Sequence, residues 1–403
     1  MLRRLAAIAM GLALGCSSGG NRPLPLVWVG TGIDYLPAST AGNVFWVEAD
    51  VDGVPGPDVI LDTGAPVALL NPPAFAGTVP EGSGRVATLT LGSTTFWKVP
   101  TVGISAPVER APNGKAYGGI VGFSVFGQFS TAFDYRGDQV VIGDAPLPAA
   151  VDPAGAGAAI LLEGGGQALL PDGTGVPLAA SRVIVPVAVE GATRSLLLDT
   201  GASWVALRRT LFDQIVADGR ALLDADVTTV SGEGKAQVAR LRSVVALGQE
   251  VAGAVSGSSS SVDGLLDTLS AEVGHRVDGM LGATFLREFY VRVDYPNAWL
   301  ALHRYATRDH ILDDYHRVGI TLAPRLGGGG TTYVVAGVYP GTDAQKQGIV
   351  AGEDLLSVDG RSLASLDPIS ADQSLIGAVG SSHELAFADR TLRVVVDELL
   401  PLP

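Results

Sequence analysis

Two copies of one tripeptide are the residues of this sequence best suited to chemistry. Asp-Thr-Gly stands at 62–64 and again at 199–201, each time directly after three apolar residues. Two carboxylates held close together cannot both ionise, so Asp62 and Asp199 would share one proton near neutral pH. The ionised member could then activate a water while the protonated member hydrogen-bonds a carbonyl oxygen. Such a pair suits the hydrolysis of a peptide bond.

The neighbours of the two aspartates can hold them in place. A threonine hydroxyl can bond across to the opposite backbone, and a glycine lets a facing loop approach where a Cβ would obstruct it. The expected supporting residues are Thr63, Gly64, Ala65, Thr200, Gly201, Ala202 and Ser203. The sequence has no His-Glu-x-x-His, no Gly-x-Ser-x-Gly elbow between a strand and a helix, and no phosphate-binding loop, so neither a metal nor another cofactor is expected.

The two tripeptides belong to an internal repeat. Residues 59–75 align with residues 196–212 without a gap, and residues 118–135 align in the same way with residues 278–295. Two blocks that recur in the same order indicate that one fold is used twice in the chain. Each aspartate would then come from a lobe of its own.

Composition indicates that both repeats are mainly β. The 403 residues include 53 glycines and 24 prolines, which favour many turns between short strands. Runs such as Val44–Val51, Val86–Leu91 and Val183–Val189 predict strands, and within the repeats only Arg208–Val216 keeps a helical period. The net charge is −14 and no basic block occurs in the body of the chain, so no nucleic acid partner is expected.

The repeats resemble retropepsin-type aspartic protease domains. The resemblance rests on Asp-Thr-Gly-Ala at 62–65 and 199–202 and on the later apolar-apolar-Gly blocks, Ile120–Gly122 and Met280–Gly282. Because one chain holds both halves, the resemblance implies a bilobal peptidase made of two acid-protease-type closed β lobes. It also implies a polypeptide substrate held in an extended cleft.

The first repeat departs from the family at Pro66, which follows Asp-Thr-Gly-Ala. In the family a polar residue there steadies the outer oxygen of the aspartate, a role that Ser203 keeps in the second repeat. Pro66 leaves open a second interpretation, in which the chain is a non-catalytic pseudo-protease, a peptide-binding scaffold of the cell envelope. A third interpretation pairs the lobes between molecules. Retention of both aspartates, threonines and glycines favours the enzyme, and a long linker favours pairing within one chain.

The second repeat has the longer spacing between its aspartate and its later glycine. Much of the surplus lies in Ser231–Lys235 and in the serine run Ser256–Ser261. The first segment predicts the tip of a mobile flap, and the second predicts a flexible loop. The expected flap residues are Ser231, Gly232, Glu233 and Gly234. Since the first repeat offers only Glu81–Gly84 as a shorter counterpart, the second lobe is expected to supply the main flap.

The C-terminal part resembles a PDZ domain, an α+β fold, of the kind attached to bacterial envelope proteases. The match runs through Val338–Ala344, Gly348–Ile349 and Gly352–Gly360, and it predicts a short helix from Asp343, a strand at 355–358 and a hairpin at 359–360. The resemblance implies a loop that receives a peptide C-terminus or loop on its backbone N–H groups while the peptide adds a strand. The loop residues would be Val318, Gly319 and Ile320. The alternative is that these residues are simply the buried start of a strand.

The N-terminus reads as an export signal. Arg3 and Arg4 precede the short apolar run Leu5–Leu14, and Cys16 follows a segment that resembles, imperfectly, a bacterial lipobox. The resemblance implies lipidation of Cys16, and hence a protein anchored to the membrane of a bacterial envelope and facing the periplasm or exterior. The alternative is a simple secretory signal with an incidental cysteine.

The expected division of the chain follows from these patterns. It is 1–16 signal peptide and lipobox, 17–30 tether, 31–148 first lobe, 149–180 linker with one strand at Ala158–Leu162, 181–306 second lobe and 312–400 PDZ domain. The fold class expected is mainly β, with two closed lobes and a C-terminal α+β module.

Overall fold

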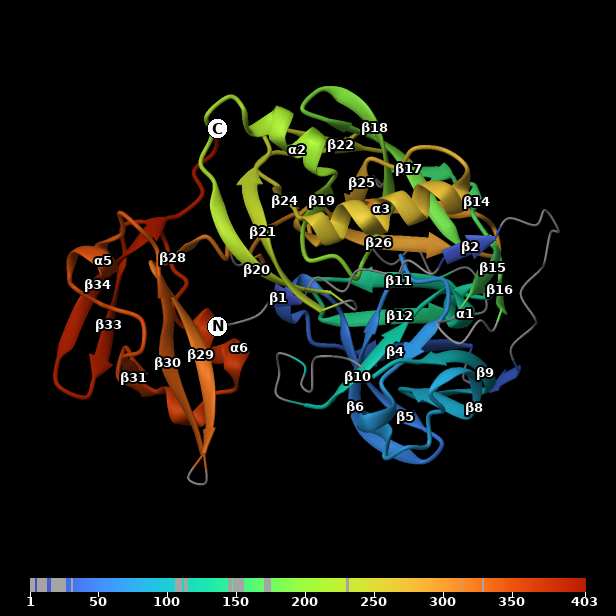
Figure 1. The fold of residues 1–403 in the computed structure, drawn as a ribbon, viewed down its shortest axis with the longest axis horizontal. Coiled ribbons are helices and arrows are strands. Elements are labelled where there is room, and N and C mark those ends of the chain that lie inside the picture. Colours follow the sequence, from blue (N-terminus) through green and yellow to red (C-terminus); the bar gives the residue numbers. More distant parts are fainter. Residues whose placement is uncertain are drawn as a thin grey trace.

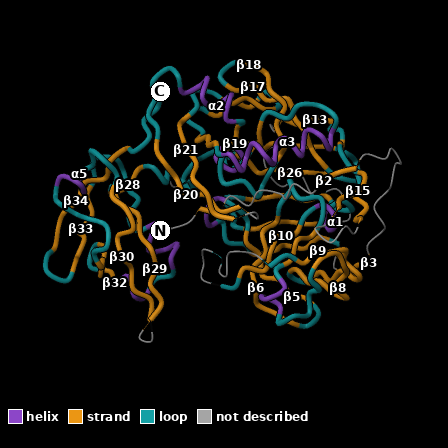
Figure 2. Tube along the Cα trace, in the orientation of Figure 1, coloured by secondary structure: helices purple, strands orange, loops and turns teal. Residues whose placement is uncertain are grey.

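The structure is a computed structural model that describes residues 4–5, 13–15, 27–29, 32–105, 111, 115–143, 147, 156–169, 175–229, 232–311, 313–327 and 330–403. Strands dominate the described residues, as Figure 2 shows. Two β lobes lie one above the other, and a separate module stands beside them (Figure 1). The mainly β, two-lobed fold expected from the sequence is confirmed.

The first lobe is a seven-stranded sheet in the order β3-β9-β7-β10-β6-β5-β8. Its elements are β3 Val27–Val29, η1 Ala41–Asn43, β5 Trp46–Val51, β6 Val54–Leu61, β7 Ala68–Leu70, η2 Pro72–Phe75, β8 Gly82–Leu91, β9 Thr94–Gly103, β10 Tyr117–Val121 and α1 Phe123–Phe126. The hairpin from β5 to β6 turns at Asp52 and Gly53, both with positive φ, which suits the twist of the two strands. Strand β6 delivers Asp62.

The second lobe repeats this plan with additions. Its elements are β14 Leu162–Glu163, β17 Arg182–Val189, β18 Ala192–Leu198, β19 Val205–Leu207, α2 Arg209–Val216, β20 Leu223–Thr229, β21 Gly232–Arg240, β22 Val244–Ala246, β23 Gln249–Val251, β24 Val255–Ser258, α3 Ser260–Val273, β25 Gly279–Leu281 and α4 Ala283–Leu286. The sheet order, β20-β21-β24-β19-β25-β18-β17-β22-β23, places β18, which delivers Asp199, beside β25. The hairpin β20–β21 and helix α3 make this lobe the larger one.

A six-stranded sheet joins the lobes in the order β13-β27-β26-β11-β12-β4. Its strands are β4 Ile33–Pro37, β11 Ser130–Asp134, β12 Gln139–Gly143, β13 Ala156–Ala159, β26 Phe289–Asp294 and β27 Trp299–Arg304. The central strands β11 and β26 come from equivalent places in the two repeats and pair antiparallel, with Ser130 opposite Asp294. One hydrophobic core runs through both lobes.

Several expectations about connecting segments are wrong in detail. Residues 149–180 are not a linker with one strand: they hold β13, β14, β15 Gly166–Leu169 and β16 Gly175–Leu178. Strand β13 pairs with β27 at the edge of the joining sheet through its backbone, so small side chains suffice there. The tether expected at 17–30 ends in β3, which pairs with β9. The short strands β1 Arg4–Leu5 and β2 Ala13–Gly15 pair with β20 and β15.

The C-terminal module has a sheet and a core of its own. It contains β28 His316–Val318, β29 Ile320–Gly327, β30 Gly330–Val338, α5 Asp343–Lys346, β31 Asp354–Val358, β32 Arg361–Ser362, η3 Leu363–Ser365, α6 Pro368–Gln373, β33 Ser382–Phe387 and β34 Thr391–Glu398. The helix, strand and hairpin predicted over 343–360 are present as α5, β31 and the β31–β32 turn. The assignment of the module to the PDZ fold stays a prediction.

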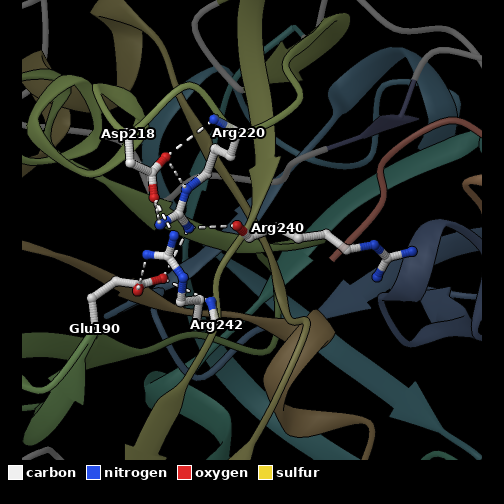
Figure 3. Close-up of polar contacts among 5 residues, drawn as sticks. All are labelled: Glu190, Asp218, Arg220, Arg240 and Arg242. Carbon is white, nitrogen blue, oxygen red and sulfur yellow. Dashed lines mark hydrogen bonds and ion pairs between the residues drawn. The ribbon is translucent and has the colours of Figure 1, made fainter. Parts of the chain in front are cut away.

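Arg240 ties both ends of this module to the second lobe. Arg240 is the last residue of β21. Its guanidinium donates to the Leu400 carbonyl and, at 2.6 Å, to the Asp313 carboxylate. Leu400 is fully buried in the core of the second lobe. The Arg240 carbonyl in turn accepts from Arg220 at 2.6 Å. Arg220 and Arg242 alternate with Asp218 and Glu190 in an ion network, and the Arg240 side chain points away from it (Figure 3).

No helix among the residues that the structure describes is long and apolar enough to cross a bilayer.

Candidate active site

The two aspartates stand at equivalent points of the two lobes. Each follows the last residue of a strand, Leu61 of β6 or Leu198 of β18. The Asp62 N–H donates to the Val121 carbonyl at 3.0 Å, and the Asp199 N–H donates to the Leu281 carbonyl at 3.2 Å. Strands β10 and β25 thus fix both loops from behind in the same way.

The threonines cross from one lobe to the other. The N–H of Thr63 donates to the Thr200 hydroxyl, and the N–H of Thr200 donates to the Thr63 hydroxyl, both at 3.1 Å. Each hydroxyl donates onward, at 2.9 Å, to the carbonyl of the leucine before the opposite aspartate. These four buried bonds lock the two loops into one unit.

The glycines bring each loop against the aspartate of the other lobe. A Cβ on Gly64 would lie 2.9 Å from Cγ of Asp199, and a Cβ on Gly201 would lie 2.6 Å from Cγ of Asp62. Real Cβ atoms do not come that close, so only glycine fits at either position. The later glycines are equally confined, since a Cβ on Gly122 would lie 2.2 Å from the Ala65 carbonyl oxygen.

The carboxylates are fully buried and have equivalent backbone partners. Oδ1 of Asp62 accepts from the Gly64 N–H at 2.6 Å, and Oδ1 of Asp199 accepts from the Gly201 N–H at 2.9 Å. Both Oδ2 atoms are buried without a hydrogen-bond partner. Burial raises the pKa of Asp62 to about 6. Burial and the neighbouring Asp62 raise the pKa of Asp199 well above its ordinary value. One proton held by the pair is the expected state near neutral pH.

The residues after each glycine are buried, as the packing of the two loops requires. Ala65, Pro66, Ala202 and Ser203 all lie inside the protein. The Ala65 carbonyl accepts from the Phe123 N–H at 2.9 Å, and the Ala202 carbonyl accepts from the Ala283 N–H at 2.8 Å. The helices α1 and α4 therefore begin directly behind the two loops.

Sequence reasoning missed Arg182 and Glu272. The Arg182 guanidinium donates to the Gly64 carbonyl, so a residue of the second lobe contacts the loop of the first. Its charge is matched by Glu272 of α3, whose carboxylate lies 2.8 Å from Nη2. The one local signal is an arginine at the head of an otherwise apolar strand, Arg182–Val189.

The flap residues fall on the β20–β21 hairpin, which extends from the second lobe toward the boundary between the lobes (Figure 1). Ser231 lies outside the described residues, Gly232 and Glu233 begin β21, and Gly234 is exposed. In the first lobe Glu81–Gly84 is not a hairpin tip, because β8 begins at Gly82 and pairs with the far end of β9. The serine run is not a flexible loop either: it forms β24, which is buried, and the start of α3.

The loop predicted to bind a peptide is buried at all three residues. The Val318 N–H donates to the Leu375 carbonyl at 2.9 Å, and the Gly319 carbonyl accepts from the Tyr339 N–H at 2.8 Å. A Cβ on Gly319 would lie 2.3 Å from Cβ of Thr342. One of the three N–H groups expected to receive a carboxylate, that of Val318, is therefore engaged within the module, while Ile320 begins β29.

Cys16, the residue expected to carry a lipid, lies outside the described residues. Within the part of the chain that the structure describes, no group of three or more His, Cys, Asp or Glu side chains is arranged to hold a metal ion.

The solved structures to which this chain is similar include two that it matches to different extents. An aspartic proteinase from Irpex lacteus is 15% identical over 68% of this chain and 98% of its own, with a TM-score of 0.39. The photosystem II D1 C-terminal processing protease is 27% identical over 21% of this chain and 24% of its own, with a TM-score of 0.18. No curated protein matches the chain.

Residues 185–285 match a protein family described as Aspartyl protease. The match begins in β17, includes the second Asp-Thr-Gly and ends in α4. It supports an aspartic protease fold in the second lobe and, in general terms, a peptidase function.

Proposed function

We propose that this chain is an aspartic endopeptidase in which Asp62 and Asp199 form the catalytic pair. The reciprocal contact between Thr63 and Thr200 carries the proposal, because it places the two carboxyl groups in one buried site. Two structural turns in a duplicated β fold would need neither that contact nor glycines pressed against the opposite carboxylate.

The proposed reaction uses one water and the single proton held by the pair. The ionised carboxylate takes a proton from the water as the water oxygen attacks the peptide carbonyl carbon, and the protonated carboxyl donates to the carbonyl oxygen. The tetrahedral diol then collapses as the C–N bond breaks: the nitrogen takes the proton that the first carboxyl gained from water, and the second carboxyl takes a proton back from a diol hydroxyl, which restores the pair. The products are a carboxylic acid and an amine, and no cofactor is required.

Peptide-library digestion tests this function. Wild type should cleave within peptides, and Asp62→Asn and Asp199→Asn should each lose nearly all activity while unfolding at a similar temperature. Near-full activity of Asp62→Asn would show that the paired mechanism is wrong. A wild type that binds library peptides and cleaves none of them would favour the pseudo-protease scaffold instead.

We also propose that the C-terminal module recruits or regulates through a peptide end bound at Val318–Ile320. The position of this loop between β28 and β29, directly beside the end of α6, supports the proposal. Fluorescence anisotropy with a library of labelled peptides tests it, each peptide carrying either a free or an amidated C-terminus. Equal affinity for both forms would exclude recognition of the carboxylate. Val318–Ile320 would then be only the buried start of a strand.

Export and membrane attachment through Cys16 complete the proposal. The support is the sequence pattern before Cys16. Expression in a bacterial host with a labelled fatty acid should label wild type and not Cys16→Ser. Absence of label on an exported wild type would indicate a simple secretory signal.

A further inference from the structure

Arg182 connects the two lobes at the site itself. It is the first residue of β17 and is 5% exposed. Its Nη1 donates to the carbonyl of Gly64, the third residue of the Asp62 loop. A guanidinium from the second lobe therefore contacts the loop that carries the aspartate of the first.

The position of this guanidinium is fixed by a buried counter-ion. Nε of Arg182 lies 3.0 Å and 3.1 Å from the two carboxylate oxygens of Glu272, and Nη2 lies 2.8 Å from one of them. The two side chains are 6% and 2% exposed. A buried ion pair is weak evidence for stability, because desolvation offsets much of its attraction. The two-pronged geometry does, however, hold the planar group in one orientation.

The charge of Arg182 acts unequally on the pair. Burial has the largest effect on the pKa of Asp62 and raises it, whereas hydrogen bonds from Asp199 and from the Gly64 N–H lower it, and so does the charge of Arg182. The pKa of Asp199 is set chiefly by burial and by Asp62, both of which raise it.

Three buried tyrosines interact electrostatically with the pair: Tyr117 and Tyr295 with Asp62, and Tyr135 with Asp199. Burial raises the pKa of each phenol above its usual range, so all three stay neutral. Arg287 acts on Tyr135.

We propose that Arg182 is a positioning residue that makes the two aspartates unequal, keeping Asp62 as the ionised member and leaving the proton on Asp199. Asp62 is then the base that takes the proton from water, and Asp199 is the acid that donates to the carbonyl. Pro66 offers no polar group to the Asp62 loop, and Arg182 supplies one from across the lobe boundary. This inference rests on the proposed function, since it assigns roles within the same pair.

The test replaces the ion pair without leaving a buried carboxylate unpaired. The variant is Arg182→Met with Glu272→Gln, and Arg182→Lys is the conservative partner. Arg208→Met with Asp267→Asn is the matched control, because Arg208 also contacts α3, at 2.5 Å from Asp267, and donates to a backbone carbonyl, that of Val277, at 2.7 Å.

The readouts are the pH dependence of kcat/KM from pH 3 to 8 and the titration of ¹³C-labelled aspartate carboxyls by NMR. The acidic limb of the profile is the range in which kcat/KM falls as the pH drops. Loss of the cation should move this limb to higher pH by about one unit, since an opposite charge nearby lowers a carboxyl pKa by about that much or more. Arg182→Lys should keep the acidic limb close to its wild-type pH, and the control substitutions should not move it. A lower plateau with unmoved limbs, or an equal shift in the control, would overturn the inference.

The NMR titration separates this inference from the proposed function. Spectra of Asp62→Asn and Asp199→Asn assign the two carboxyl signals. If no peptide is cleaved, the proposed function fails, and the signals still report which carboxyl holds the proton. An Asp62 signal that titrates at the same pH with and without Arg182 refutes the role assigned to this residue.

Discussion

Thr63 and Thr200 hold each other by two equal bonds of 3.1 Å from N–H to hydroxyl, one in each direction across the lobe boundary. Thr200→Val keeps the shape of the side chain and removes the hydroxyl, so the Thr63 N–H and the Leu61 carbonyl lose their partner. An unsatisfied buried group costs about 1–3 kcal/mol. We expect the free energy of unfolding to fall by about 2–4 kcal/mol and cleavage to be lost, measured by chemical denaturation and peptide digestion. Thr200→Ser should retain most of both, and equal losses in Ser and Val would contradict this role.

Gly201 lies so close to Asp62 that adding a single methyl group should displace the carboxylate or the backbone. Gly201→Ala would put a carbon 2.6 Å from Cγ of Asp62, and the backbone must shift to admit it. Misplacement of a reacting group by about 1 Å can cost about 100-fold in rate, so we expect kcat/KM to fall by about that factor.

Gly264 provides the control for that prediction. It lies inside α3 and has open space around it. Gly264→Ala should leave cleavage unchanged and raise the free energy of unfolding by about 0.5–1 kcal/mol, because alanine loses less backbone entropy in a helix. If both substitutions had the same effect on cleavage, the contact between Gly201 and Asp62 would not matter for the reaction.

The pH window of activity follows from the shared proton. Below the lower apparent pKa both carboxyls are protonated and no base exists, and above the higher one both are ionised and no acid exists. Burial raises the pKa of Asp62 to about 6, and burial together with the neighbouring Asp62 raises the pKa of Asp199 well above its ordinary value, so both limbs lie above those of an exposed carboxyl. We expect an optimum at weakly acidic to near-neutral pH, measured as kcat/KM on one cleaved peptide.

Ala202→Ser adds a hydroxyl next to the Asp199 loop. A hydrogen bond donated to a charged carboxylate favours that form and lowers its pKa, so the profile should move toward acid. A wild-type optimum near pH 2–3, or a shift toward alkali in Ala202→Ser, would contradict this account of the pair.

The parts of the site that the sequence predicts are those repeated within it. The two Asp-Thr-Gly copies follow apolar strands, and a twofold arrangement of a duplicated fold brings them together. Arg182 could not be found this way, since its partners Gly64 and Glu272 are 118 and 90 residues away along the chain. No local pattern relates residues at such separations.

The serine run shows how composition can mislead about order. Serine and glycine read as a flexible loop, yet β24 is buried and Ser259 caps α3 by accepting from the Val262 N–H at 3.3 Å. The small residues serve packing, because a Cβ on Gly257 would lie 2.5 Å from the indole nitrogen of Trp204. Only the assembled sheet reveals that requirement.

The C-terminal tail is part of the second lobe's core, which alters what removal of the module should do. Leu400 is fully buried in a core cluster that also contains residues of α3 and β21, and Arg240 donates to its carbonyl. Deletion of residues 312–403 should therefore leave the two lobes folded with a weakened second lobe, rather than an unperturbed core. Leu400→Ala tests the same contact within the full chain.

Leu400→Ala should destabilise the second lobe by about 2–4 kcal/mol, the usual cost of a cavity left by a buried leucine. Because a chain of several domains need not unfold in one step, the measurement is hydrogen exchange resolved by segment. Exchange should accelerate in α3 and β21 and stay unchanged in the first lobe and in β29–β34. Leu402→Ala is the control, since that side chain is 63% exposed two residues later. If the two alanine variants exchange alike, the tail is a surface appendage and Arg240 anchors the module alone.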